Sequence, residues 1–87
     1  MNTKAFIRRL KTETDPVRRG NIMQMELRFH GYTLAAVARS LGKSFMGVKH
    51  AVVDDQKSER IQTHIAGLLG VDRAELWPRR YKDDKAA

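Results

Sequence analysis

The chain has 87 residues, no cysteine, and 17 Lys and Arg residues against 10 Asp and Glu, which gives a formal net charge of +7. This length suits one domain with a modest core, and the lack of cysteine excludes disulfides, as is common in a reducing cytoplasm. The N-terminus has no long apolar run, so no signal peptide is indicated. No apolar stretch of the sequence reaches the length of a membrane span.

Positive charge is distributed unevenly along the chain. Residues 32–53 contain three basic and no acidic side chains, whereas residues 54–76 contain three basic and five acidic ones. Net positive charge therefore lies in the N-terminal part, the centre and the C-terminus. A polyanion is the expected partner, because basic residues release counterions when they neutralise phosphates. Charge alone does not separate DNA from RNA or from an anionic membrane.

Residues 1–14 are compatible with two structures. They form either a short helix with Phe6, Ile7 and Leu10 along one side, or a flexible basic arm built on their four Lys and Arg residues.

A longer helix is predicted from Pro16 to His30. Asp15 is its expected N-cap, Pro16 favours the first helical position, and Gly31 is suited to follow the end. Gly20 weakens its first half. Its apolar residues cover a broad face: Ile22, Met23, Met25, Leu27 and Phe29.

Residues 34–53 fit a helix-turn-helix. Thr33 is the expected cap of the first helix, Gly42 ends that helix, and Ser44 is the expected cap of a second helix at 45–53. The steep crossing of two such helices needs a small residue on the first, a turn residue that tolerates positive φ, and apolar residues at fixed places. Ala38 and Gly42 meet the first two needs. The apolar places are filled by Leu34, Val37, Leu41, Val48 and Ala51.

The C-terminal third predicts one more long helix and a short turn. Residues 54–56 form a polar connection, Ser58 and Glu59 start the helix, and Gly70 ends it. Its buried stripe is Ile61, Ile65, Leu68 and Leu69. Asp72 and Glu75 resemble a capping box. Trp77 is expected to pack over the helix at 58–69, and residues 82–87 to form a flexible tail. The fold class is therefore all-α, a compact domain of four to five helices at residues 15–81.

Helical geometry divides the helix at 45–53 into two faces. With about 100° per residue, Val48 and Ala51 lie on one side and Met46, Lys49 and His50 lie opposite. Phe45 lies on the border between the two faces. Packing in the core and contact with the DNA groove are equally compatible with its position. Base contacts are thus expected from Phe45, Met46, Lys49 and His50. Phosphate contacts are expected from Arg39, Lys43, Ser44, Arg79 and Arg80.

The chain resembles the Ner-like helix-turn-helix regulators of Mu-type phages and bacteria, which have the lambda-repressor-like fold. Residues 76–81, Leu-Trp-Pro-Arg-Arg-Tyr, are similar to the family's Trp-Pro-x-Arg-Tyr close, and they follow Ile65-Ala66 at the family's distance. Residues 34–52 align without a gap and keep Arg39 and Gly42. The resemblance covers about residues 23–81. It implies a phage or prophage regulator that binds operator DNA and typically represses transcription.

Other functions are less well supported by the residues. The three histidines are not spaced as metal ligands are, and the sequence has no glycine-rich loop of the kind that binds phosphate. No enzyme, metal site, cofactor or small-molecule ligand is therefore indicated. The expected partner is double-stranded DNA, bound in the nucleoid of the cytoplasm, with a homodimer on repeated half-sites as a possibility. Two alternatives stay open: a protein-interaction or antitoxin-type module, and a non-specific nucleoid-binding protein. RNA is disfavoured because aromatic and basic residues are not interleaved.

Overall fold

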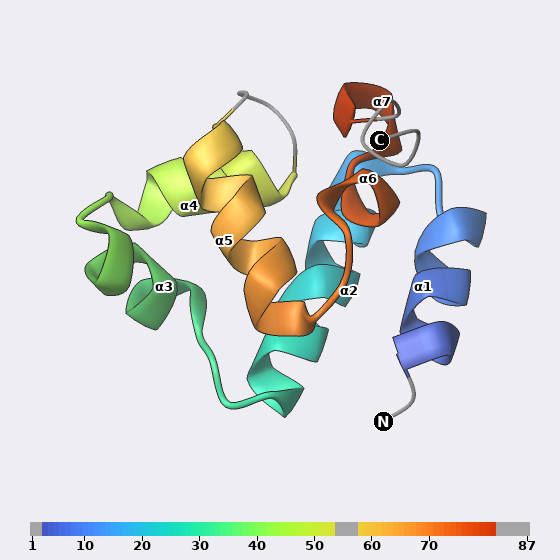
Figure 1. The fold of residues 1–87 in the computed structure, drawn as a ribbon, viewed down its shortest axis with the longest axis horizontal. Coiled ribbons are helices and arrows are strands. Elements are labelled where there is room, and N and C mark those ends of the chain that lie inside the picture. The colour runs from blue at the N-terminus through green and yellow to red at the C-terminus, as the bar shows by residue number, and fades with distance from the viewer. Residues whose placement is uncertain (1–2, 54–57, 82–87) are drawn as a thin grey trace.

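The computed structural model describes residues 3–53 and 58–81, and these residues form seven helices and no strand. The helices are α1 (Thr3–Thr12), α2 (Pro16–Phe29), α3 (Leu34–Leu41), α4 (Phe45–Val52), α5 (Glu59–Leu69), α6 (Arg73–Leu76) and α7 (Pro78–Tyr81) (Figure 1). The radius of gyration, 11.9 Å, matches the value of about 12 Å expected for a compact chain of this length. The all-α prediction is confirmed, with more helices than expected.

Local capping signals explain where the first helices begin. The side chains of Asp15, Thr33 and Ser44 accept hydrogen bonds of 2.9, 3.1 and 3.0 Å from the backbone N–H three residues further on. Each bond satisfies one of the amides that a helix N-terminus leaves without a partner. The predicted starts of α2, α3 and α4 are therefore confirmed.

The capping box predicted at Asp72 and Glu75 is wrong. The Asp72 side chain makes no cap hydrogen bond, and the Glu75 amide donates to the Asp72 backbone oxygen instead, at 2.9 Å. The four-residue helix α6 is stabilised by its neighbours rather than by a capped first turn: Ala74 and Leu76 are buried.

The N-terminal segment forms a packed helix and not a flexible arm. Phe6, Ile7 and Leu10 of α1 are buried in the same core as the rest of the chain. The Arg19 guanidinium reinforces this packing, because it donates to the backbone oxygens of Leu10 and Glu13 at the end of α1, and to that of Leu76 at 2.6 Å. One side chain thus joins α1, α2 and α6.

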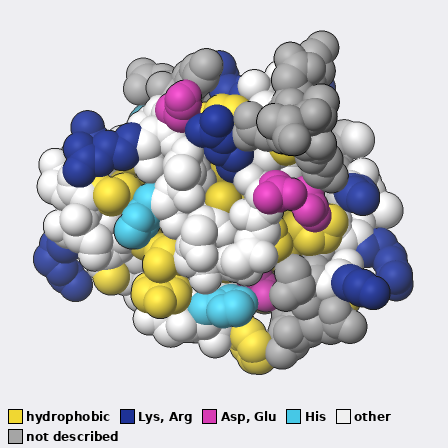
Figure 2. Space-filling model, in the orientation of Figure 1, with side chains coloured by type: hydrophobic (Ala, Val, Ile, Leu, Met, Phe, Trp, Pro, Cys, Tyr) yellow, Lys and Arg dark blue, Asp and Glu magenta, His cyan; other side chains and the backbone are white. Residues whose placement is uncertain are grey.

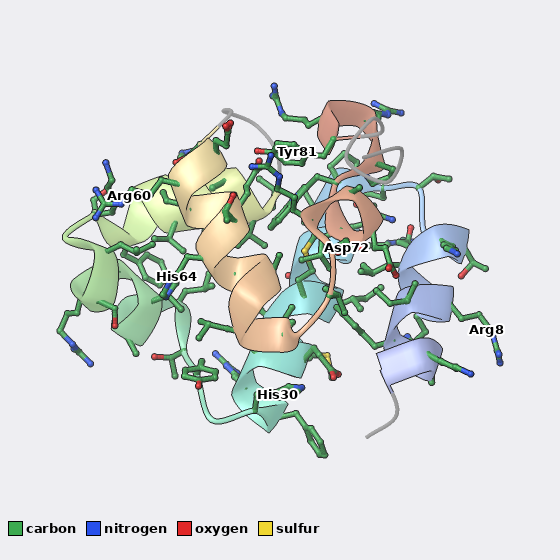
Figure 3. The ribbon with its side chains drawn as sticks, in the orientation of Figure 1. Arg8, His30, Arg60, His64, Asp72 and Tyr81 are labelled. Carbon is green, nitrogen blue, oxygen red and sulfur yellow. The ribbon has the colours of Figure 1, made fainter. Side chains whose placement is uncertain are left out.

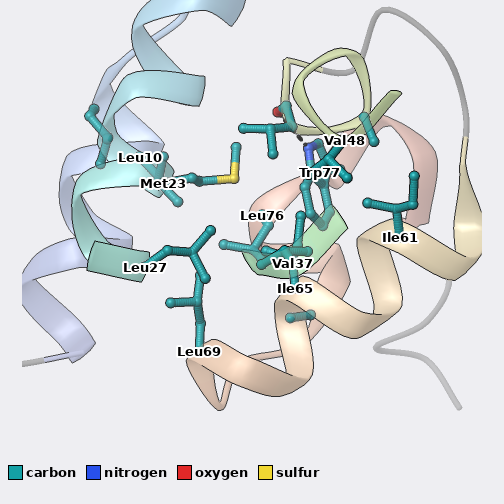
Figure 4. Packing of buried hydrophobic residues seen from close by; sticks show 14 of the residues in the cluster. Leu10, Met23, Leu27, Val37, Val48, Ile61, Ile65, Leu69, Leu76 and Trp77 are labelled. Carbon is teal, nitrogen blue, oxygen red and sulfur yellow. Dashed lines mark hydrogen bonds between the residues drawn. The ribbon is translucent and has the colours of Figure 1, made fainter. Parts of the chain in front are cut away.

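The core lies where α2, α4, α5 and α6 meet, and its central side chains come from all parts of the chain (Figure 4). Of the five apolar residues expected to bury one face of α2, Ile22, Met23 and Leu27 do so. Met25 and Phe29 remain 62% and 59% exposed, because they line an open groove beside α1. The broad apolar face is therefore only partly covered by described residues.

Two predictions lie outside the described residues. They are the polar connection at 54–56 and the tail at 82–87. Among the described helices, none combines the length and the apolar character that a membrane span requires.

Candidate nucleic-acid interface

The connection between α3 and α4 is a three-residue turn that begins with Gly42. Gly42 has a φ of 65°, a left-handed conformation that glycine adopts without a steric penalty. The Lys43 amide donates to the Ala38 oxygen at 3.0 Å and the Gly42 amide to the Arg39 oxygen at 3.3 Å. This Schellman arrangement ends α3 and turns the chain so that Ser44 can cap α4.

Helix α4 has a buried side and an exposed side. Val48, Ala51 and Val52 are fully buried. Phe45 and Met46, two neighbouring large apolar side chains, are 48% and 52% exposed. Lys49 is exposed, and His50 is partly buried and has an interaction partner within the chain. The border residue Phe45 therefore lies on the solvent side, whereas Val52 belongs to the core.

Cationic side chains lie near both ends of α4. Arg39 and Lys43 are exposed at the end of α3 and in the turn before α4. Arg79 lines a cleft together with Val52 and Val53 at the other end of α4, and Arg80 beside it is exposed. In Figure 2, Lys and Arg side chains are visible both toward α3 and α4 and, separately, toward α1. The sequence from residue 32 to 53 contains no acid to neutralise the first group.

Ser44 has a structural role at this surface. Its Oγ accepts the Gly47 amide at 3.0 Å, and the residue is exposed. The hydroxyl hydrogen remains able to donate to an anion that approaches the start of α4. Capping and phosphate binding are therefore compatible at this residue.

The C-terminal end of α4 is held by buried hydrogen bonds from α5 and the residues after it. The Gln62 amide donates to the Ala51 oxygen at 2.9 Å, and its Oε1 accepts from the Tyr81 hydroxyl at 2.5 Å. The Trp77 indole N–H donates to the Val52 oxygen at 3.1 Å. The bonds from Gln62 and Trp77 satisfy carbonyl groups of the last turn of α4, which lack partners within the helix itself.

Trp77 also contributes to the end of α4. The indole was expected to pack over residues 58–69, and its N–H donates to the Val52 oxygen at the end of α4. Its burial, with 3% of the side chain exposed, is as expected. The Arg73 guanidinium covers the ring of Tyr81, which is labelled in Figure 3, and lies 4.2 Å from the ring centre.

Two residues that position α4 were missed by the sequence interpretation. Gln62 is a buried glutamine among the apolar residues of α5, and its place within an apolar stripe was the available signal. Gly20 was interpreted only as a weak point of α2. A Cβ there would lie 2.7 Å from Val53 Cγ1, so the glycine allows α2 to approach the end of α4 closely.

Among the described residues, no acidic side chain belongs to α3 or α4. Glu59 lies 3.8 Å from Arg73, and Glu75 lines a groove with residues of α1. Within residues 3–53 and 58–81, no group of three or more His, Cys, Asp or Glu side chains is placed to hold a metal ion. The exposed surface of α3 and α4 thus combines cations with apolar side chains.

No curated protein and no solved structure matches the chain. A family model described as winged helix-turn-helix DNA-binding matches residues 21–87. The match contains α3 to α7 and most of α2, and it leaves out α1. Over the described residues only the helical part of that family's architecture is present, since they contain no strand. The match spans most of the chain. The protein therefore binds DNA and belongs to the winged helix-turn-helix DNA-binding family.

Proposed function

We propose that the protein is a sequence-specific transcription regulator, a repressor, that inserts α4 into the major groove of operator DNA. The observation that carries this proposal is the division of α4 into a fully buried side and an exposed side with Phe45, Met46 and Lys49. A recognition helix needs this division, because one face holds it on the domain while the other meets base edges.

The side chains on the exposed face suit base edges in different ways. Phe45 and Met46 offer apolar contact to thymine methyl groups, and Lys49 donates to guanine acceptors. His50, beside Lys49, is the fourth base-contacting residue of the proposal. Such contacts specify sequence, whereas contacts to phosphates set register and orientation.

Phosphate contacts are proposed at both ends of α4. Arg39, Lys43 and Ser44 act at its start, where the first amides of the helix also favour an anion. Arg79 and Arg80 act at its other end. An eight-residue helix is about 12 Å long, so cations at its two ends can reach the phosphate backbones that border one groove.

Repression and binding as a homodimer are part of the same proposal. The similarity of residues 76–81 to the close of Ner-like regulators supports a repressor, which acts by occupying an operator. A single small domain reads few base pairs, so genomic specificity favours two copies on repeated half-sites.

The experiment is a selection of duplexes from a randomised DNA pool with the intact chain, followed by affinity measurements on the enriched site and on a scrambled duplex. The double variant Lys49→Ala/His50→Ala should lower affinity for the enriched site by about tenfold or more, since a good base contact contributes about 1–3 kcal/mol of discrimination. Its affinity for the scrambled duplex should fall much less.

Lys49→Ala and Lys11→Ala form a matched pair for this experiment, because both remove one exposed lysine. Lys11 lies in α1, away from α4. Its removal should weaken binding to both duplexes slightly and equally. An equal loss on both duplexes with Lys49→Ala would contradict base reading. A pool without any enriched sequence would indicate a non-specific DNA-binding protein instead.

A further inference from the structure

A groove between α1 and α2 exposes apolar side chains that no described residue covers. It has a volume of about 510 Å³, and its lining includes Phe6, Arg9, Ile22, Met25, Arg28 and Phe29. Phe6 and Ile22 form a buried floor, whereas Met25 and Phe29 are 62% and 59% exposed. Single exposed apolar residues are ordinary, but two that line one groove indicate a binding surface.

The groove has the shape that receives a helix. Four of its five α2 residues, at 22, 25, 26 and 29, follow the helical spacing i, i+3, i+4, i+7 and so form one continuous stripe. The opposite wall is α1, which packs along α2. Two packed helices leave a furrow into which the ridge of a third helix fits, and amphipathic helices commonly bind such furrows.

The groove is separate from the proposed DNA surface. In Figure 1, α1 lies on one side of the molecule and α3 and α4 lie on the other, with α5 between them. The residues of α1 also lie outside the family match, which begins at residue 21. One wall of the groove is thus an addition to the part of the chain that resembles the family.

Charge identifies the kind of occupant. Helix α1 contains four basic residues and no acidic one, and Arg9 and Arg28 line the groove itself. Glu26 is the one acidic lining residue, but it is 4% exposed and its Oε2 lies 3.2 Å from His30 Nε2 (Figure 3). The open part of the groove is therefore positive as well as apolar.

A second copy of this chain does not complement such a groove. Two copies that met through this face would bring Arg9 and Arg28 of each toward the same residues of the other. Helix α5, which carries Glu59, has its apolar stripe buried in the core already. DNA is also a poor occupant, because a phosphate backbone gains nothing from Met25 and Phe29.

We propose that the α1–α2 groove binds an acidic amphipathic helix of another protein. Its apolar side chains fill the space between Met25 and Phe29, and its flanking Asp or Glu residues pair with Arg9 and Arg28. Occupation of the groove leaves α4 accessible, so the regulator binds this partner and DNA at the same time. The inference does not depend on which DNA sequence is read.

The test uses a fluorescent synthetic helix of about 15 residues, with leucine at i, i+4 and i+7 and glutamate on both flanks of that stripe. A second peptide carries lysine in place of every glutamate. Fluorescence anisotropy with the intact chain should show binding of the acidic peptide and at least about tenfold weaker binding of the basic one.

Two variants of α2 locate the site. Phe29→Ala should weaken binding of the acidic peptide by about tenfold or more, since it removes a large apolar contact. Val17→Ala is the matched control, because Val17 is 60% exposed on the same helix but does not line the groove, and it should have no effect. The double variant Arg9→Glu/Arg28→Glu should reverse the preference toward the basic peptide.

Three outcomes would overturn the proposal: no binding of the acidic peptide, binding that Phe29→Ala leaves unchanged, or equal binding of both peptides. Sedimentation equilibrium of the chain alone adds a fourth, because self-association that Phe29→Ala abolishes would assign the groove to a second copy. Phe29→Ala should leave DNA affinity and the circular dichroism spectrum unchanged, which distinguishes loss of this site from unfolding and from loss of the DNA surface.

Discussion

Replacing Gln62 with leucine tests whether buried hydrogen bonds hold the last turn of α4 in place. Gln62 is fully buried, and leucine is close to it in size but has no polar atom. In the variant, the Ala51 oxygen loses a donor at 2.9 Å and the Tyr81 hydroxyl loses an acceptor at 2.5 Å. Packing is largely kept, so the change isolates the polar contribution.

The expected loss follows from the two buried groups. Each buried polar group that loses its partner costs about 1–3 kcal/mol, and the apolar surface of leucine offsets part of the sum. We expect the free energy of unfolding to fall by about 2–4 kcal/mol. A domain of this size has about 4–13 kcal/mol in total, so the variant should still fold, with a Tm at least about 10 °C lower.

The assay is urea unfolding followed by circular dichroism and by the fluorescence of Trp77, with Tyr81→Phe and the double variant completing a cycle. In the double variant no Tyr81 hydroxyl is left without an acceptor. The double variant should therefore lose less free energy of unfolding than the sum of the two single losses, by about 1–2 kcal/mol. A Gln62→Leu variant as stable as the unmodified chain, or strict additivity across the cycle, would refute the reasoning. DNA affinity measured where all variants are folded should fall with Gln62→Leu, because α4 loses its fixed end.

Three further predictions concern charge and glycine. Arg79→Ala should weaken binding to every duplex and reduce the slope of log affinity against log salt by about one; an unchanged slope would make Arg79 ordinary surface charge. Gly20→Ala brings a Cβ to 2.7 Å from Val53 and should cost about 1–3 kcal/mol in urea unfolding. Gly42→Ala should cost about 1–2 kcal/mol, whereas Gly67→Ala, a helical site with open space around it, should gain about 0.5–1 kcal/mol; equal effects would contradict the strained turn.

Local features of the fold could be predicted from the sequence because they depend on neighbouring residues. The caps at Asp15, Thr33 and Ser44 bind amides three residues away, and Gly42 takes its left-handed conformation within its own turn. The helical period likewise places Val48 and Ala51 on the opposite side of α4 from Met46. The sequence alone therefore determined the helix-turn-helix segment and the side of α4 that faces solvent.

Other features depend on elements that are distant in the sequence, and only the tertiary structure decided them. Phe45 lies at the border of its helix, and the period alone leaves its side undetermined. Arg19 binds Leu76 across 57 residues, Gln62 and Trp77 hold the end of α4, and Gly20 admits Val53. Met25 and Phe29 match the pattern of core residues, yet they line an open groove. A sequence pattern reports that a side chain is apolar or polar, but its burial is set by which helix packs against it.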